Sequence, residues 1–310
     1  MYVDVAAHIL TPKFSEKYKA ISPITKDRIE FTTPHCSDFD VRLRWMNRYP
    51  HVLEILTMAN VPLEQWVEKK EDAIELAKIG NEELAEIVLK YPDKFMGAAA
   101  VVPMNDVDAA CKEAERAVKD LGLLGIQLYT RINGEPVADE KFRPIFELMN
   151  ELDRPVWIHP GLNPHLDPDN DIFTWEFELT SAMHKLVFAG IYKEFPNLKI
   201  IIHHAGAMIP FYRGRVKYTI NLYDLPYKNL SEDFEKFYVD TAIYGNTDGL
   251  MEAYNYYGVD HMLFGTDAPL GAKYGMVEGT IESIERMSIP EEDKQKILKY
   301  NALDMFNMVL

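Results

Sequence analysis

The chain has 310 residues, and its 33 Lys and Arg against 49 Asp and Glu give a formal net charge of −16 at pH 7. Such a charge repels nucleic acid and anionic lipid at long range, so neither is expected as a partner. A hydrophobic content of 47% is enough for a sizeable globular core.

The cellular compartment is predicted from the two cysteines and the N-terminal residues. Cys36 and Cys111 are too few and too far apart for a secreted disulfide framework. Residues 1–5 include Asp4, where a signal peptide would be cationic and then apolar. The sequence contains no run of about 18 apolar residues, so no membrane-spanning helix is predicted. We expect a soluble, cytoplasmic protein.

Eight short apolar runs recur along the chain, with longer amphipathic segments between them. The runs cover residues 2–5, 51–57, 95–102, 125–130, 155–159, 199–204, 237–241 and 262–267. Near-continuous apolar runs of this length are typical of parallel strands that are buried on both faces.

The segments between the runs have the periodicity of helices. They predict helices at residues 70–91, 107–121, 139–152, 174–195 and about 278–287. Strand and helix alternating about eight times favour an α/β fold of the (β/α)₈ TIM-barrel type, with an open doubly wound sheet as the alternative. We predict one domain over residues 1–310, with an excursion at about 11–38 that forms a flap over the mouth.

Four of the predicted strands are followed by groups that can bind metal or move protons: His8, His159, His204 and Asp267. The carboxyl ends of all strands in a parallel barrel open onto one face, so these groups should meet there. One His after a strand is more often a hydrogen-bonded structural residue, but four strand ends together favour a site for Zn²⁺ or a similar ion. His203 precedes His204, and the strand pleat should turn only one of them into the barrel; we expect His204.

These strand ends lie in motifs that resemble a known family. The motifs are DVAAHIL at residues 4–10, FMGAAAVVP at 95–103, WIHP at 157–160, HAGAMIPF at 204–211 and FGTDAP at 264–269. In this order they resemble the amidohydrolase superfamily. Specifically, they resemble its amidohydrolase 2 branch, which includes aminocarboxymuconate-semialdehyde decarboxylase, γ-resorcylate decarboxylase and related hydrolases and hydratases.

The resemblance implies a distorted amidohydrolase barrel with one divalent metal ion, Zn²⁺ or alternatively Mn²⁺. His8, His159 and Asp267 would be its ligands, Asp267 would also carry protons, and His204 would be the acid/base. Family members have His-x-His or Glu-x-His in the first strand, whereas Ala6 stands at the first of these positions here. Alanine offers no donor atom, so metal affinity should be lower unless water, substrate or another side chain replaces the missing ligand.

The same resemblance implies where a substrate would bind and how the chain assembles. Arg215 would bind a substrate carboxylate, in some family members from the neighbouring subunit, and Trp175 would line a pocket for a planar ring. A surface ion pair is the alternative role for Arg215, and packing on a helix face is the alternative for Trp175. A homodimer is the usual arrangement in similar proteins.

Three functions follow from the sequence. The first is metal-dependent, non-oxidative decarboxylation of a small aromatic or enoic carboxylic acid, with His204 or Asp267 giving a proton to carbon. The second is hydrolysis of a lactone, amide or C–C bond by a metal-activated water. The third is a non-enzymatic role. Because Ala6 replaces a metal ligand, the barrel would hold no metal and would bind a ligand or partner without turnover. Serine-hydrolase elbows and nucleotide-binding fingerprints are missing from the sequence.

Overall fold

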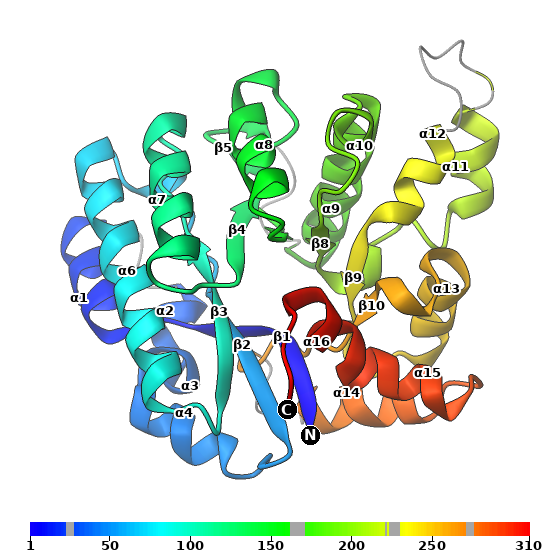
Figure 1. The fold of residues 1–310 in the computed structure, drawn as a ribbon, viewed down its shortest axis with the longest axis horizontal. Helices are drawn as coiled ribbons and strands as arrows, with labels where there is room; N and C mark the ends of the chain where they lie inside the picture. Colours follow the sequence, from blue (N-terminus) through cyan, green and yellow to red (C-terminus); the bar gives the residue numbers. More distant parts are fainter. Residues whose placement is uncertain (23–27, 162–170, 221, 223–229, 271–275) are drawn as a thin grey trace.

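The protein folds around one sheet of eight parallel strands surrounded by helices, as Figure 1 shows. The computed structural model describes residues 1–22, 28–161, 171–220, 222, 230–270 and 276–310. The strands are β1 (Tyr2–Ile9), β2 (Val52–Met58), β3 (Phe95–Val101), β4 (Gly125–Tyr129), β7 (Val156–His159), β8 (Ile200–Ile202), β9 (Tyr238–Asp240) and β10 (Met262–Leu263), in that spatial order. Each matches one predicted run.

The sheet closes on itself. Beyond β10 the chain forms a parallel bridge from Ala268 to Ala7 in β1. The Val5 amide donates to the Phe264 carbonyl at 2.9 Å, and the Asp267 amide donates to the Ala6 carbonyl at 2.9 Å. These bonds join the last strand to the first, so the predicted barrel is confirmed and the open sheet is wrong.

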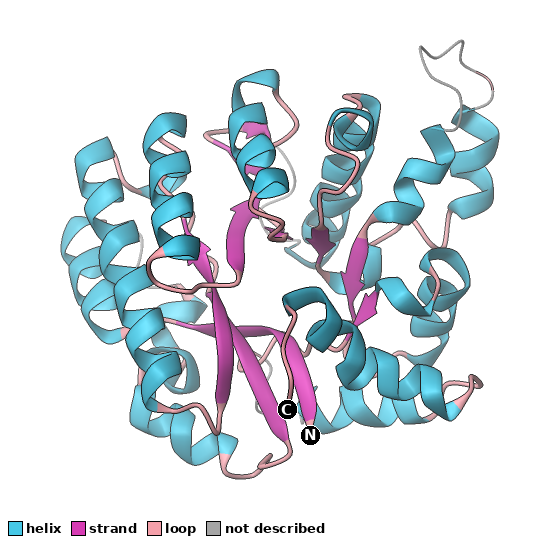
Figure 2. Cartoon of the chain, viewed as in Figure 1, coloured by secondary structure: helices cyan, strands magenta, loops and turns pink. Residues whose placement is uncertain are grey.

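Helices form the outer layer of the barrel, as the predicted alternation requires (Figure 2). The predicted ones are α6 (Lys70–Lys90), α7 (Val107–Lys119), α8 (Arg143–Glu151), α9 (Asp171–Phe188) and α14 (Met276–Glu285). The others are α4 (Phe39–Met46), α5 (Leu63–Trp66), α10 (Ile191–Glu194), α11 (Arg213–Ile220), α12 (Leu230–Asp233), α13 (Thr247–Tyr257), α15 (Glu291–Gln295) and α16 (Asn301–Phe306). The single helix expected at 174–195 is divided because Gly190, at φ 74°, ends α9. No helix in the described ranges is long and apolar enough to cross a membrane.

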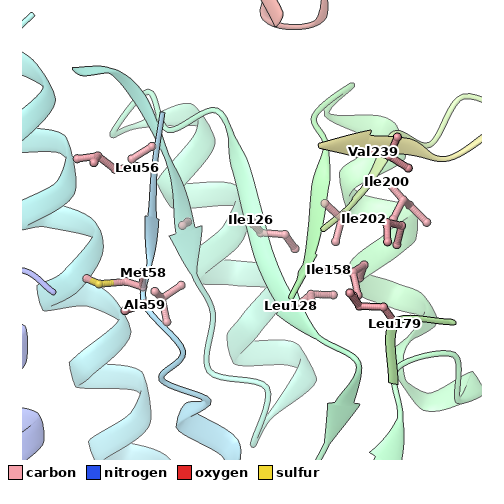
Figure 3. Packing of buried hydrophobic residues seen from close by; sticks show 14 of the residues in the cluster. Leu56, Met58, Ala59, Ile126, Leu128, Ile158, Leu179, Ile200, Ile202 and Val239 are labelled. Carbon is pink, nitrogen blue, oxygen red and sulfur yellow. The ribbon is translucent and has the colours of Figure 1, made fainter. Parts of the chain in front are cut away.

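Strand side chains alternate between two apolar cores. Ile158, Ile200 and Ile202 belong to the core between strands and helices, part of which Figure 3 shows. The intervening residues Trp157 and Ile201 point inward and pack with residues of α16. The Trp157 ring stacks on Phe306 with centroids 5.8 Å apart, so α16 closes the barrel at the end opposite the mouth.

The excursion after β1 is mostly helical. It contains α1 (Pro12–Ile21), α2 (Ile29–Thr32) and α3 (Pro34–Ser37), while residues 23–27 lie outside the described ranges. The Glu83 carboxylate in α6 accepts hydrogen bonds from the amides of Lys13 and Phe14, which attaches α1 to the barrel's outer layer. Residues 28–30 line the cavity at the mouth. That the whole excursion forms a flap over the mouth stays a prediction.

Candidate active site at the carboxyl end of the barrel

A cavity of about 380 Å³ opens at the carboxyl ends of the strands. Its lining residues come from segments far apart in the sequence: Arg28, Ile29, Glu30, Asn60, His159, Pro160, Trp175, His204, Tyr244, Asp267 and Leu270. The structure thus brings together four residues that the sequence singled out, namely His159, Trp175, His204 and Asp267. The fifth, His8, is fully buried and contacts Asp267.

The first strand presents His8 to the mouth through an irregular backbone. The register with β2 shifts between Asp4 and Ala7, which indicates a bulge. The buried Asp4 carboxylate accepts hydrogen bonds from the amides of Ala6 and Thr266, at 3.0 and 3.1 Å, and from the Thr266 hydroxyl. Asp4 therefore fixes the first strand to the segment that carries Asp267, which is a structural role.

Two contacts hold the His8 ring. Nδ1 lies 2.8 Å from the Thr57 hydroxyl, and Nε2 lies 2.8 Å from Asp267 Oδ1. The second contact is close but not aligned as a hydrogen bond, so Nε2 is a buried nitrogen without a hydrogen-bond partner. A buried polar atom in this condition is costly unless something else satisfies it.

The Asp267 carboxylate is held in its ionised form. Its Oδ2 accepts a hydrogen bond from the Tyr244 hydroxyl at 2.5 Å. Burial raises the pKa of Asp267, but the nearby His8 and His204 rings and the hydrogen bond from Tyr244 outweigh burial and lower this pKa well below its ordinary value. An ionised carboxylate beside imidazole nitrogens is a donor set that divalent ions accept.

Three imidazole rings meet at the base of the cavity. The ring centroids of His8 and His159 are 5.2 Å apart, those of His159 and His203 are 5.1 Å apart, and those of His8 and His203 are 6.0 Å apart. His159 Nδ1 donates to the Pro160 carbonyl at 2.9 Å. Burial, reinforced by the neighbouring imidazoles, lowers the pKa of His159 well below its ordinary value, so this ring is neutral.

His203 and His204 both reach the mouth, so the expectation that only His204 faces the barrel is wrong. The physical reason is that β8 ends at Ile202 and His204 has φ 58°, so the strand pleat no longer governs either side chain. His203 is fully buried, with Nδ1 2.7 Å from Asp240 Oδ2.

His204 lies at the cavity wall and is paired with an acid. Its Nδ1 lies 2.7 Å from Glu176 Oε1. Burial lowers the pKa of His204, but the hydrogen bond and charge of Glu176 outweigh burial and raise it to about 9. At neutral pH the ring therefore carries a proton that it can donate.

The mouth partly fits the metal that the sequence predicts. In the part of the chain that the structure describes, no three His, Cys, Asp or Glu side chains are already arranged around an ion. The donor chemistry is nevertheless suitable, because His8 Nε2 has no hydrogen-bond partner, His159 is neutral and Asp267 is ionised. A divalent ion would satisfy these groups together.

Arg215 is placed differently from the other predicted residues. It lines a second, mostly apolar hollow of about 650 Å³, together with Phe177 and His184 of α9 and with Tyr212, which precedes α11. Within the described residues, the arginine that lines the mouth cavity is Arg28. The substrate role of Arg215 stays a prediction, and in this placement it would require a second subunit.

Sequence reasoning missed three polar residues of the site: Glu176, Asp240 and Tyr244. Asp240 ends β9 and is the last residue but one of the predicted run 237–241, so the positional signal that marked His159 could have found it. Glu176 lies on a helix face and Tyr244 follows β9 in a turn. No local pattern marks these two as site residues, because only tertiary structure brings them to His204 and Asp267.

Comparison with known proteins supports the same architecture. A family model described as amidohydrolase, Amidohydro_2, matches residues 4–308. The 2-amino-3-carboxymuconate-6-semialdehyde decarboxylase of Dictyostelium discoideum is 29% identical, over 99% of this chain and 91% of its own. The γ-resorcylate decarboxylase of Rhodococcus jostii (strain RHA1) is 31% identical, over 87% of both chains.

A solved structure gives the same fold. It is the dihydroxybenzoic acid decarboxylase of Polaromonas sp. JS666 with bound manganese and an inhibitor, 2-nitroresorcinol. It superimposes with a TM-score of 0.80 at 26% identity, covering 99% of this chain and 96% of that one.

Proposed function

Because this chain belongs to the amidohydrolase family, we propose that it is a metal-dependent, non-oxidative decarboxylase of a small aromatic carboxylic acid. Two of its relatives and one similar structure are decarboxylases by name, and two of those names contain resorcylate or dihydroxybenzoic acid. The mouth cavity of about 380 Å³ has room for a single-ring acid of this class.

The observation that carries the proposal is the pair of His204 and Glu176 at the cavity wall. In decarboxylation a ring carbon accepts a proton, its bond to the carboxylate breaks, CO₂ leaves, and the electron pair of that bond stays with the ring. The step needs a proton donor near the cavity, and His204 with a pKa of about 9 is a donor at neutral pH. Hydrolysis would instead need a base there, so the geometry favours decarboxylation.

The residues that would hold the metal are His8, His159 and Asp267, as the family resemblance implies. When bound, a divalent ion would attract the substrate carboxylate and an adjacent hydroxyl oxygen and balance their negative charge. Manganese is the ion to test first, because the similar Polaromonas enzyme has it bound, and Zn²⁺ is the second.

The substrate ring would lie against Trp175, whose side chain lines the cavity beside His159. Arg28 provides a positive charge at the same wall, although it is already paired with Glu30 at 2.9 Å. A homodimer in which Arg215 completes the partner's site is a further part of the proposal. Sedimentation or light scattering measures that state directly.

The test is to incubate metal-reconstituted protein with hydroxybenzoates, including γ-resorcylate, and with lactones and amides as a matched panel in ¹⁸O-labelled water. We expect CO₂ release with no ¹⁸O in the organic product, and one deuterium on the ring when the reaction is repeated in ²H₂O. Entry of ¹⁸O into the product without CO₂ would identify a hydrolase. No turnover, together with no bound metal and no change in melting temperature on chelation, would identify a ligand-binding barrel.

A further inference from the structure

We propose that His203 is a metal ligand of this chain and replaces the first-strand ligand that is lost at Ala6. This inference rests on the proposed function, because it concerns the ion that the function requires. The family resemblance gives roles to His8 and His159 but none to His203, the third buried imidazole of this group.

The first line of evidence is how the three rings are held. Each Nδ1 has a neighbour outside the group: His8 has the Thr57 hydroxyl, His159 the Pro160 carbonyl, and His203 the Asp240 carboxylate. A carbonyl oxygen can only accept, so Nδ1 of His159 carries the proton and its Nε2 keeps its lone pair. His203 Nδ1 lies 2.7 Å from Asp240 Oδ2, close but not aligned as a hydrogen bond. Metal-binding histidines are commonly oriented in this way by a second group.

The second line of evidence is the free nitrogens. His8 Nε2 and both ring nitrogens of His203 are buried and have no hydrogen-bond partner. Buried nitrogens in this condition oppose folding unless something else satisfies them. An ion shared by the two rings would satisfy one nitrogen of each, whereas a purely structural role leaves both nitrogens of His203 without a partner.

The third line of evidence is the spacing of the rings. With a metal–nitrogen bond of about 2.0–2.1 Å, an imidazole centre lies about 3.2 Å from the ion. The circle through the three centroids, which are 5.1, 5.2 and 6.0 Å apart, has a radius of about 3.2 Å. One point is therefore at bonding distance from all three rings once each Nε2 turns toward it.

The fourth line of evidence links His203 to the lost ligand. A Cβ on Gly265 would lie 3.0 Å from Ala6 Cβ and 2.7 Å from Asp240 Cβ, so Ala6 and Asp240 flank the same glycine. The position of the missing ligand thus borders the carboxylate that holds His203. Gly265 is closely packed between Ala6 and Asp240, and the Asp240 carboxylate lies 2.7 Å from His203 Nδ1, so His203 is one contact away from the position of the missing ligand.

The test compares wild type with His203→Ala, Ala6→His and the double variant, using His261→Ala as a control because that ring bonds the Glu235 carbonyl away from the mouth. Each protein is stripped with chelator and loaded with Zn²⁺, Mn²⁺ or Co²⁺. Affinity is measured by titration, bound histidines are counted by X-ray absorption, and the melting temperature of the metal-free form shows whether each variant folds.

We expect three histidine ligands in wild type, two in His203→Ala with affinity at least about 100-fold weaker, and three again in the double variant with most of the affinity recovered. Ala6→His alone should gain little. An unchanged ligand count and affinity in His203→Ala would overturn the inference, as would a wild type that binds no metal. A wild type that binds metal through three histidines but decarboxylates nothing would overturn the proposed function and leave this inference standing.

Discussion

The two ends of the barrel differ in the side chains that fill their interior. At the amino end the interior is apolar, and Val3, Val5 and Trp157 pack against the C-terminal helix. At the carboxyl end the interior holds buried carboxylates and histidines, and three of the imidazole nitrogens have no hydrogen-bond partner. Burying polar groups in this way opposes folding, so we infer that one end stabilises the barrel and the other serves its chemistry.

The largest effect is expected at the mouth, from Asp267→Asn. The change removes the charge beside His8 and replaces one of the two carboxylate oxygens with an NH₂ group, so activity should fall on the order of 10³–10⁴-fold. The melting temperature of the metal-free protein should change by only a few degrees. Steady-state kinetics and thermal unfolding measure the two effects. A large loss of stability with modest loss of activity would contradict the division between the two ends.

Trp157→Ala tests the amino end. The fully buried indole stacks on Phe306 and donates to the Val5 carbonyl at 3.0 Å, so its loss should lower the free energy of unfolding by about 3–5 kcal/mol. KM and the pH profile of the folded fraction should stay unchanged. The matched control is Trp175→Ala at the mouth, which should raise KM at little cost in stability. If the two variants behaved alike, the ends would not be specialised.

Glu176→Gln tests the proton donor. Because Glu176 raises the pKa of His204 to about 9, activity that needs protonated His204 should persist up to that pH and fall above it. In Glu176→Gln the carboxylate is gone, so the pH above which activity falls should shift down to about 6.5 or below. The pair's contribution to stability should be complete below about pH 6.5 and lost as pH rises through 9. Reaction rates measured from pH 5 to 10 test this prediction. If activity falls at the same pH in Glu176→Gln as in wild type, His204 is not the proton donor.

The barrel could be predicted from the sequence because each buried strand appears as a short apolar run and these runs recur along the chain. All eight runs became strands, and His8, His159 and Asp267 could be placed at the mouth because parallel strands share one carboxyl edge. The same rule failed at His203 and His204. It assumes an extended strand, whereas these residues follow the end of β8 and His204 has a positive φ.

Contacts between distant elements could not be predicted. Glu176 in α9 meets His204, which is 28 residues away in the sequence, and Tyr244 after β9 meets Asp267, which is 23 residues away. Single-sequence patterns report local periodicity and not such contacts. Glu176 and Tyr244, which influence the pKa values of His204 and Asp267, therefore could not be identified from the sequence.

The smallest effect is expected from Glu64→Gln, near the carboxyl ends of β2 and β4. Glu64 is buried, its Oε1 has no hydrogen-bond partner, and burial raises its pKa to about 8. The folded state thus holds this proton more tightly than the unfolded state, and Glu64 makes the protein less stable as pH rises from about 4.5 to 8. The amide has no such penalty, so the variant should be more stable at pH 8 by about 1–2 kcal/mol and little changed at pH 4.5. Denaturant unfolding at both pH values measures this, with the exposed Glu147→Gln as the control. Equal effects of Glu64→Gln at the two pH values would mean that burial of this carboxyl does not destabilise the folded protein.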